Sequence, residues 1–208
     1  MEADNILKDL LDEFGITIDK DWGQLRGEWN EGLWKLDDLK TTAQGIKDFA
    51  DKIGTVQTFR DKIGPATIQR RAGEAGSILD GPANGHFGFT ANGVVTLWNG
   101  AFDHGEDYAK STVVHELAHV WDKVGFANPN GGPLAEAMQT AIGTHAWFGG
   151  WGPYDTSNST PQGPNKDYAE TSPREDWAVT VAAWVYNDSL TVTPDRGNFL
   201  AKFRAINP

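Results

Sequence analysis

Two histidines and a glutamate stand at a spacing that can bind a metal ion. The segment Ser111–Asp122 reads STVVHELAHVWD and contains His115, Glu116 and His119. Residues four apart lie one turn above the other on a helix, so both imidazoles face the same way and can bind one zinc ion. Glu116 is offset by one residue, which places its carboxylate beside the metal, where it can take a proton from water. The pattern predicts a water-activating zinc site.

The residues around this motif are apolar on almost every side of the predicted helix, namely Val113, Val114, Leu117, Ala118 and Val120. Such a helix is expected to be buried. Two histidines and a glutamate on a buried helix need partners, because unpaired polar groups are costly away from water. Metal binding supplies those partners, and the alternative is a chance match to the pattern.

Zinc in a catalytic site needs a third protein ligand and an open position. The chain has no cysteine, so the ligand must be a histidine or a carboxylate. No histidine follows shortly after the motif, because position 125 is glycine. The candidates further along the chain are Glu136, His145, Asp155, Glu170, Glu175 and Asp176.

Glu175 is favoured because it opens a predicted helix over residues 173–187 with an apolar face that includes Trp177 and Val181. A carboxylate in the first turn of a helix packed beside the motif can point at the metal. The alternative is a capping box, because Ser172-Pro173-Arg174-Glu175 also fits a helix start.

Together, HELAH and the segment from Tyr168 to Ala178 (YAETSPREDWA) resemble the gluzincins of the anthrax-lethal-factor and Pro-Pro-endopeptidase type. The resemblance covers roughly residues 90–187 and implies a zincin-like fold. It also implies that Glu175 is the third zinc ligand and that Tyr168 donates a hydrogen bond to the tetrahedral intermediate. Packing of Tyr168 in its loop is the alternative. The long connection over residues 120–167 departs from the group, so no substrate preference follows.

Two aspartates lie near the predicted ligands. Asp122 is on the same helix face as the histidines, and Asp176 adjoins Glu175. Either can orient a ligand imidazole, and either can be an ordinary helix charge. His86, His104 and His145 are predicted not to bind the metal.

An extended peptide substrate is expected along a strand just before the motif helix. Val94-Val95-Thr96-Leu97-Trp98 is the candidate, read as an edge strand whose backbone pairs with the peptide. The alternative is a core strand.

The predicted fold class is α+β and zincin-like, with an edge strand beside the active-site helix and a mostly helical C-terminal part. A helical annex is predicted over residues 1–64 and a catalytic domain over 65–208. The hydrophobic pattern predicts helices over residues 4–14, 21–40, 43–53, 111–124, 133–146, 173–187 and 194–206, strands over 67–71, 86–90 and 94–98, a turn at 91–93 and a loop over 148–167.

The composition limits the partners. The net charge of −11 argues against nucleic acid and anionic membranes as partners, and no apolar run has the length of a membrane span.

The expected protein is a zinc-dependent metalloendopeptidase acting on a peptide or protein substrate. The alternatives are a hydrolase of another amide such as a cell-wall peptide, an effector or toxin protease domain of a larger secreted protein, and a zinc-bound non-catalytic interaction module. Export as part of a larger protein is favoured over the cytoplasm, and nothing indicates the oligomeric state.

Overall fold

The structure is a computed structural model of the 208-residue chain. It describes residues 2–19, 34–71, 88–123, 131–142, 166–169, 171–187 and 192–204. Within these ranges the helices are α1 (Glu2–Phe14), α2 (Leu36–Ile53), α3 (Val56–Lys62), α4 (Asn99–Asp103), α5 (Glu106–Trp121), α6 (Pro133–Ile142), α7 (Lys166–Ala169), α8 (Pro173–Val185) and α9 (Pro194–Ala201). The strands are β1 (Ile16–Asp19), β2 (Ala66–Arg71), β3 (Gly88–Ala91) and β4 (Val94–Trp98).

The described strands form one mixed sheet in the order β1-β2-β4-β3. The pairs β1–β2 and β2–β4 are parallel, and β3 runs antiparallel to β4. A two-residue turn joins β3 to β4, with Asn92 at φ 52° and Gly93 at φ 77°. This left-handed pair is the geometry that Asn-Gly favours in tight hairpins, so the predicted turn is confirmed.

The prediction that Val94–Trp98 is an edge strand is wrong. β4 pairs with β2 on one side and with β3 on the other, so its backbone is used within the sheet. The alternative, a core strand, is correct, since Val95 and Leu97 are buried in the core. The edge strand beside α5 is instead β3.

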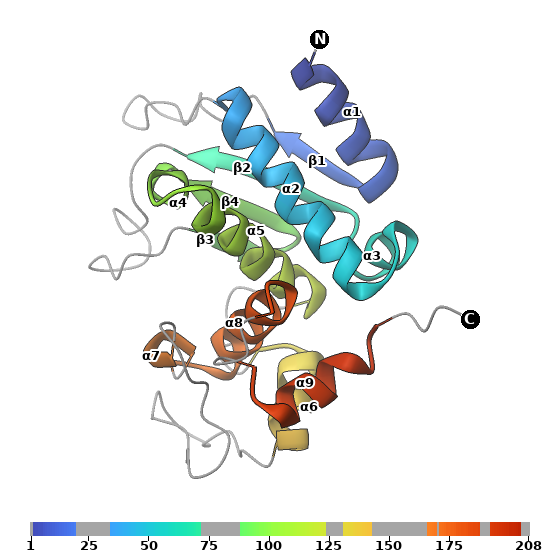
Figure 1. Ribbon diagram of the computed structural model, residues 1–208, viewed down its shortest axis with the longest axis vertical. Coiled ribbons are helices and arrows are strands. Elements are labelled where there is room, and N and C mark those ends of the chain that lie inside the picture. The colour runs from blue at the N-terminus through green and yellow to red at the C-terminus, as the bar shows by residue number, and fades with distance from the viewer. Residues whose placement is uncertain are drawn as a thin grey trace.

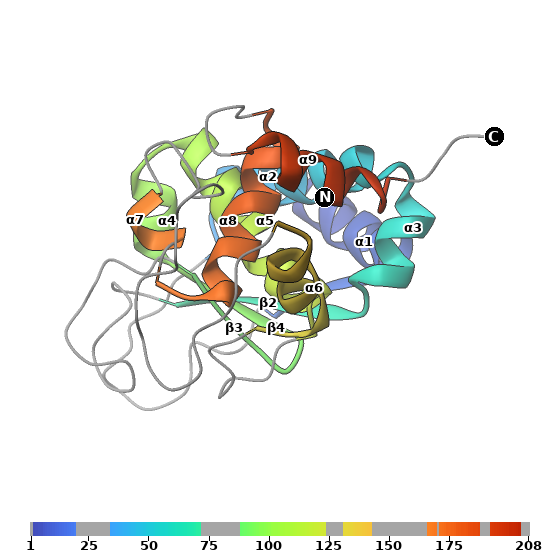
Figure 2. The same ribbon diagram turned by 90° about the horizontal axis from the view of Figure 1, so that it is seen from below.

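Helices α2 and α5 lie across one face of the sheet, and α8 packs along α5 (Figure 1; Figure 2). The strands turn their apolar residues toward these helices, as the alternating burial of β2 illustrates. Ile68 lies beside Val95 in this layer and is fully buried. The order of helices, sheet and helices confirms the α+β class.

The N-terminal elements belong to the same packed body as the motif helix. β1 extends the sheet, and α2 packs directly on α5. One hydrophobic cluster contains residues from both sides of position 64, among them Phe49, Phe59, Val113 and Trp177. The division at residue 64 stays a prediction, but the described residues on its two sides share one core.

Some elements differ from the predicted ones. Helix α2 runs unbroken from Leu36 to Ile53, where two helices were predicted. Thr42 lies inside it and donates its hydroxyl to the carbonyl of Asp38 at 2.9 Å, so the polar residues at the predicted break stay helical. β1, α3 and α4 are too short to give a periodic pattern. Of the predicted helix 21–40, residues 21–33 lie outside the described part, as do residues 143–146 and most of loop 148–167.

None of the described helices has both the length and the apolar character needed to cross a membrane.

Candidate metal centre and active site

Helix α5 brings the two motif histidines together. His115 and His119 lie one turn apart, with ring centroids 4.8 Å from each other. The helix is buried by α2 on one side and α8 on the other, and the side chain of His119 is only 2% exposed. Its Nδ1 atom has no hydrogen-bond partner among the described residues, whereas its Nε2 atom faces α8. The two imidazoles therefore lie in a buried seam, by which we mean the contact between α5 and α8.

Two contacts set the position of α8. The hydroxyl of Ser172 accepts a hydrogen bond from the backbone N–H of Glu175 at 3.2 Å, which caps the helix, and Pro173 occupies its first position. The buried indole of Trp177 donates to the carbonyl of Ala118 at 2.9 Å. This bond fastens α8 to α5 at the residue before His119, so the first turn of α8 faces the histidines.

The carboxylate of Glu175 points at both imidazoles. Its Oε2 atom lies 3.0 Å from His115 Nε2 and 3.4 Å from His119 Nε2. The ligand atoms of the three residues all lie within 4.8 Å of one another. Ser172 supplies the cap with its hydroxyl, and the Glu175 side chain turns toward the imidazoles instead, so capping by Ser172 is compatible with metal binding by Glu175, which stays a prediction. Two imidazoles and one carboxylate are a donor set that suits zinc and leaves a coordination position free.

The charges in this cluster favour an ionised carboxylate. Burial alone would raise the pKa of Glu175, but the charge and hydrogen bonds of His119 and His115 bring it well below its usual value. Burial lowers the pKa of His115, and the hydrogen bond and charge of Glu175 outweigh it, so this pKa is raised. Glu175 also lies in the first turn of α8, where the helix dipole favours a negative charge. An ionised carboxylate is the form that binds a metal cation.

Tyr168 from α7 completes one side of the cluster. Its ring centroid lies 5.7 Å from that of His115. Burial, followed by the negative charges of Glu175 and Glu116, raises the pKa of Tyr168, and a hydrogen bond to Glu175 adds to this. The phenol therefore keeps its proton over the whole range in which proteins are usually studied and can act as a donor.

Glu116 is buried beside the edge strand β3 and is 4% exposed. The hydroxyl of Thr90 lies 2.6 Å from its Oε2 atom. Gly88, two residues earlier on the same face, leaves the space that the carboxylate occupies, because a Cβ atom there would lie 2.4 Å from Oε1. Neither Thr90 nor Gly88 was predicted from the sequence to belong to the site. Glycine within a strand pattern signals such a close approach, and that signal was present at position 88.

Arg174 is a third residue that the sequence analysis did not single out. Its Nη2 atom donates to the backbone carbonyl of Thr90 at 3.1 Å, and its Nε atom lies 3.8 Å from Glu175 Oε1. The side chain is mostly buried, and Nε has no hydrogen-bond partner in the part of the chain that the structure describes. Arg174 thus connects α8 to the edge strand next to the site.

Asp122 does not orient an imidazole, which corrects the prediction. Its carboxylate accepts backbone N–H groups from Gly132 at 2.6 Å, Leu134 at 2.6 Å and Ala135 at 3.1 Å, and so caps α6. Burial raises the pKa of Asp122 despite these three donors. A Cβ at Gly132 would lie 1.9 Å from the Asp122 carbonyl, so the chain can approach this closely only with glycine. Asp122 joins α5 to α6.

Asp176 also has a different role from the predicted one. It forms a buried ion pair with Arg196 of α9, with Nη2 at 2.8 Å and Nε at 3.3 Å. Gln139 of α6 and Thr180 of α8 donate to the same carboxylate at 2.9 and 3.2 Å. Asp176 therefore joins three helices behind the site and does not contact the imidazoles.

The other candidates do not join the cluster within the described residues. Glu136 is exposed on α6. His104 follows α4, near the start of α5, and its ring centroid lies 5.1 Å from that of Tyr108. His86, His145, Asp155 and Glu170 lie outside the described residues.

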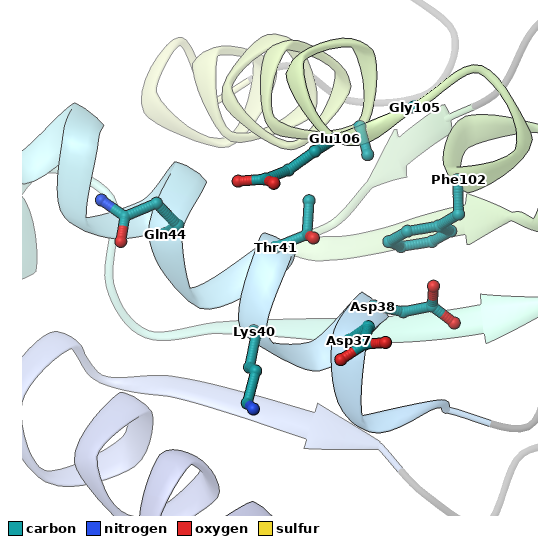
Figure 3. A pocket seen from close by; sticks show the side chains of 9 residues that line it. Asp37, Asp38, Lys40, Thr41, Gln44, Phe102, Gly105 and Glu106 are labelled. Atoms are coloured by element: carbon teal, nitrogen blue, oxygen red, sulfur yellow. The ribbon is translucent and has the colours of Figure 1, made fainter.

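A separate cavity of about 550 Å³ lies where the first turns of α2 meet the start of α5 (Figure 3). Phe102 and the acidic residues Asp37, Asp38 and Glu106 line it. Asp38 is paired with the buried guanidinium of Arg70, Lys40 with Glu2, and Glu106 with Lys110. The cavity contains none of the motif residues, which lie in the second half of α5.

Comparisons with known proteins do not identify a family for this chain. No protein-family model matches the sequence, and no curated protein matches it. One similar solved structure is a protein from Bacteroides caccae described as a "putative zinc-binding metallo-peptidase". It shares 18% identity over 99% of this chain and 77% of that chain, with a TM-score of 0.41. A likeness this distant carries no functional argument, so function has to be inferred from the site.

Proposed function

We propose that this protein is a zinc-dependent metallopeptidase. The observation that carries the proposal is the convergence of His115, His119 and Glu175, whose ligand atoms lie within 4.8 Å of one another in a buried seam. Bound there, zinc would polarise a peptide carbonyl and make water acidic enough to be deprotonated near neutral pH. The finer proposal is a gluzincin-type endopeptidase similar to the anthrax-lethal-factor and Pro-Pro-endopeptidase group.

Two further side chains have the chemistry that hydrolysis needs. Glu116 is a buried carboxylate on the same helix as the histidines and can accept a proton from the attacking water. Tyr168 keeps its proton and lies against His115, so it can donate to the negative oxygen that forms on the substrate. The presence of both groups favours an active enzyme over a non-catalytic zinc module.

The edge strand β3 is the proposed binding surface for an extended peptide. In a two-residue hairpin the pair next to the turn, Ala91 and Val94, is hydrogen-bonded, and bonded pairs alternate with non-bonded ones. The backbone groups of Thr90 and Gly88 therefore point away from β4. Arg174 binds the carbonyl of Thr90, and no other residue in the described part of the chain is seen to bind this edge, so the N–H of Thr90 and both groups of Gly88 can pair with a substrate.

Metal analysis combined with cleavage of an unbiased peptide library tests the proposal. We expect about one zinc per chain, cleavage of internal peptide bonds, loss of cleavage with a chelator and recovery with zinc. Glu116→Gln should keep zinc and lose nearly all activity, whereas Glu136→Gln, an exposed glutamate on α6, should behave as the wild type. Zinc-free wild-type protein that cannot be loaded, or a Glu116→Gln variant with normal turnover, would contradict the proposal.

An effector or toxin domain of a larger exported protein remains a proposal about biological context. Such a domain would use the same hydrolytic chemistry, and its test would use a host protein as the substrate in place of the peptide library.

A further inference from the structure

The carboxylate of Glu116 depends on one side chain for its hydrogen bonding. Thr90 is 1% exposed and lies opposite Glu116, with its hydroxyl 2.6 Å from Oε2 and 3.0 Å from the Glu116 carbonyl. Within the described residues no other side chain donates to this carboxylate. A buried carboxylate that loses its donor rotates to find another or is destabilised. Thr90 therefore sets where the carboxylate lies.

Thr90 is itself fixed from the opposite side. Its carbonyl points to the edge of the sheet where none of the described strands pairs with β3, and Arg174 provides the donor at 3.1 Å. The same guanidinium lies 3.8 Å from the carboxylate of Glu175. A continuous series of polar contacts thus connects Glu116 to Thr90, Thr90 to Arg174 and Arg174 to Glu175, and Thr90 is the one residue of the edge strand in it.

We propose that Thr90 and Arg174 are positioning residues for hydrolysis. Thr90 holds the Glu116 carboxylate by its hydroxyl, and Arg174 holds Thr90 by its backbone at a fixed place relative to Glu175. In this proposal both residues act through Glu116 and Glu175 and not on the reacting atoms, and the inference rests on the proposed function. Its consequence is that the general base and the third metal ligand are aligned through the strand on which the peptide lies.

The first test replaces the hydroxyl of Thr90. Thr90→Val keeps the shape of the side chain and should lower kcat by about tenfold to 10²-fold, with KM and zinc content unchanged, because only the orientation of the base is lost. Thr90→Ser restores the hydroxyl and should return kcat to within a few-fold of the wild type. The matched control is Thr42→Val, a buried threonine of α2 that donates to Asp38 far from the site and should leave kcat unchanged.

The second test examines Arg174. Arg174→Ala should lower kcat more in the wild type than in the Thr90→Val background, because the part of its effect that passes through Thr90 is already lost there, whereas its contact with Glu175 is lost in both. Arg174→Lys should recover part of the loss. Arg60→Ala is the control, since Arg60 also donates to a backbone carbonyl, that of Asp12, on a distant helix pair.

A third measurement does not depend on turnover. In the zinc-free protein, Thr90→Val should lower the melting temperature more in the wild type than in a Glu116→Ala background, where no carboxylate needs the donor. Thr90→Ala gives the same contrast if Thr90→Val does not fold.

The outcomes separate the two proposals. An inactive wild type would reject the proposed function, while the melting temperatures would still decide whether Thr90 and Glu116 are coupled. An active wild type with unchanged kcat in Thr90→Val, additive losses in Thr90→Val/Arg174→Ala, or equal melting shifts in both backgrounds would overturn the positioning role and leave the peptidase proposal standing.

Discussion

Gly88→Ala should damage catalysis far more than it damages the fold. The added Cβ atom would lie 2.4 Å from Oε1, 2.5 Å from Cγ and 2.7 Å from Cδ of Glu116. Ordinary contacts of this kind begin at about 3.4 Å, so the two groups must separate by about 1 Å. The backbone of β3 is fixed by its pairing with β4, whereas the glutamate side chain can rotate. Glu116 should therefore move away from Thr90.

The expected magnitude follows from that displacement. A catalytic group moved by about 1 Å typically loses about 10²-fold in rate. Moving the carboxylate also breaks its hydrogen bond with Thr90, which costs roughly 1.5–3 kcal/mol for a charged acceptor. Replacing glycine with alanine gains about 0.4–1 kcal/mol where the backbone is compatible, and Gly88 does not have a positive φ. The net loss of stability is then about 0.5–2.6 kcal/mol, which leaves a folded protein.

The assay compares kcat, zinc content and urea unfolding of the wild type and Gly88→Ala. Gly197→Ala is the control, because the nearest atom to a Cβ at this helix position lies at an ordinary 3.5 Å. We expect Gly88→Ala to retain zinc and fold, with kcat lower by about 10²-fold. Wild-type turnover in folded, zinc-loaded Gly88→Ala would refute the idea that Glu116 must occupy the place seen here.

The remaining predictions concern the ligands and their surroundings. Glu175→Gln should weaken zinc binding, measured by competition with a chelator, by more than the roughly 10–100-fold that changes around metal ligands cause, while the zinc-free fold survives. Ser172→Ala should do the reverse, with about 1 kcal/mol lower stability in urea and nearly normal zinc binding. Tyr168→Phe should bind zinc normally and lower kcat by about 10²–10³-fold, and an unchanged kcat would exclude it as a donor in the transition state. Asp176→Asn should lower the free energy of unfolding by about 3–5 kcal/mol, because it leaves Arg196 charged at 1% exposure, and a loss below about 1 kcal/mol would show that the pair contributes little.

Local patterns were sufficient to predict the elements that carry the site. The spacing of His115 and His119 predicts a helix face, and the Ser-Pro start of α8 predicts where Glu175 stands on its first turn. The Asn92-Gly93 turn predicts the hairpin of β3 and β4. Each of these signals lies within a few residues of what it predicts, so tertiary contacts did not overrule it.

The sequence did not reveal what depends on pairing across distant segments. Nothing near Val94 indicates that β2 lies on its other side, because parallel pairing joins segments far apart in the chain. Asp122 and Asp176 look like candidates for orienting a histidine until their partners are known. Those partners are the backbone after Gly131 for one and Arg196 for the other. Charge and position alone do not distinguish these uses.

The first turn of α8 directs successive residues to different parts of the molecule. Arg174 reaches the edge strand, Glu175 reaches the imidazoles, and Asp176 reaches α9. Consecutive residues of a helix point about 100° apart, so this division depends on the rotational phase of the helix. An inserted residue between Ser172 and Arg174 would rotate all three side chains away from their partners at once. A change in length before Lys166 would instead leave both the phase of α8 and the position of Tyr168 relative to the Ser172 cap unchanged.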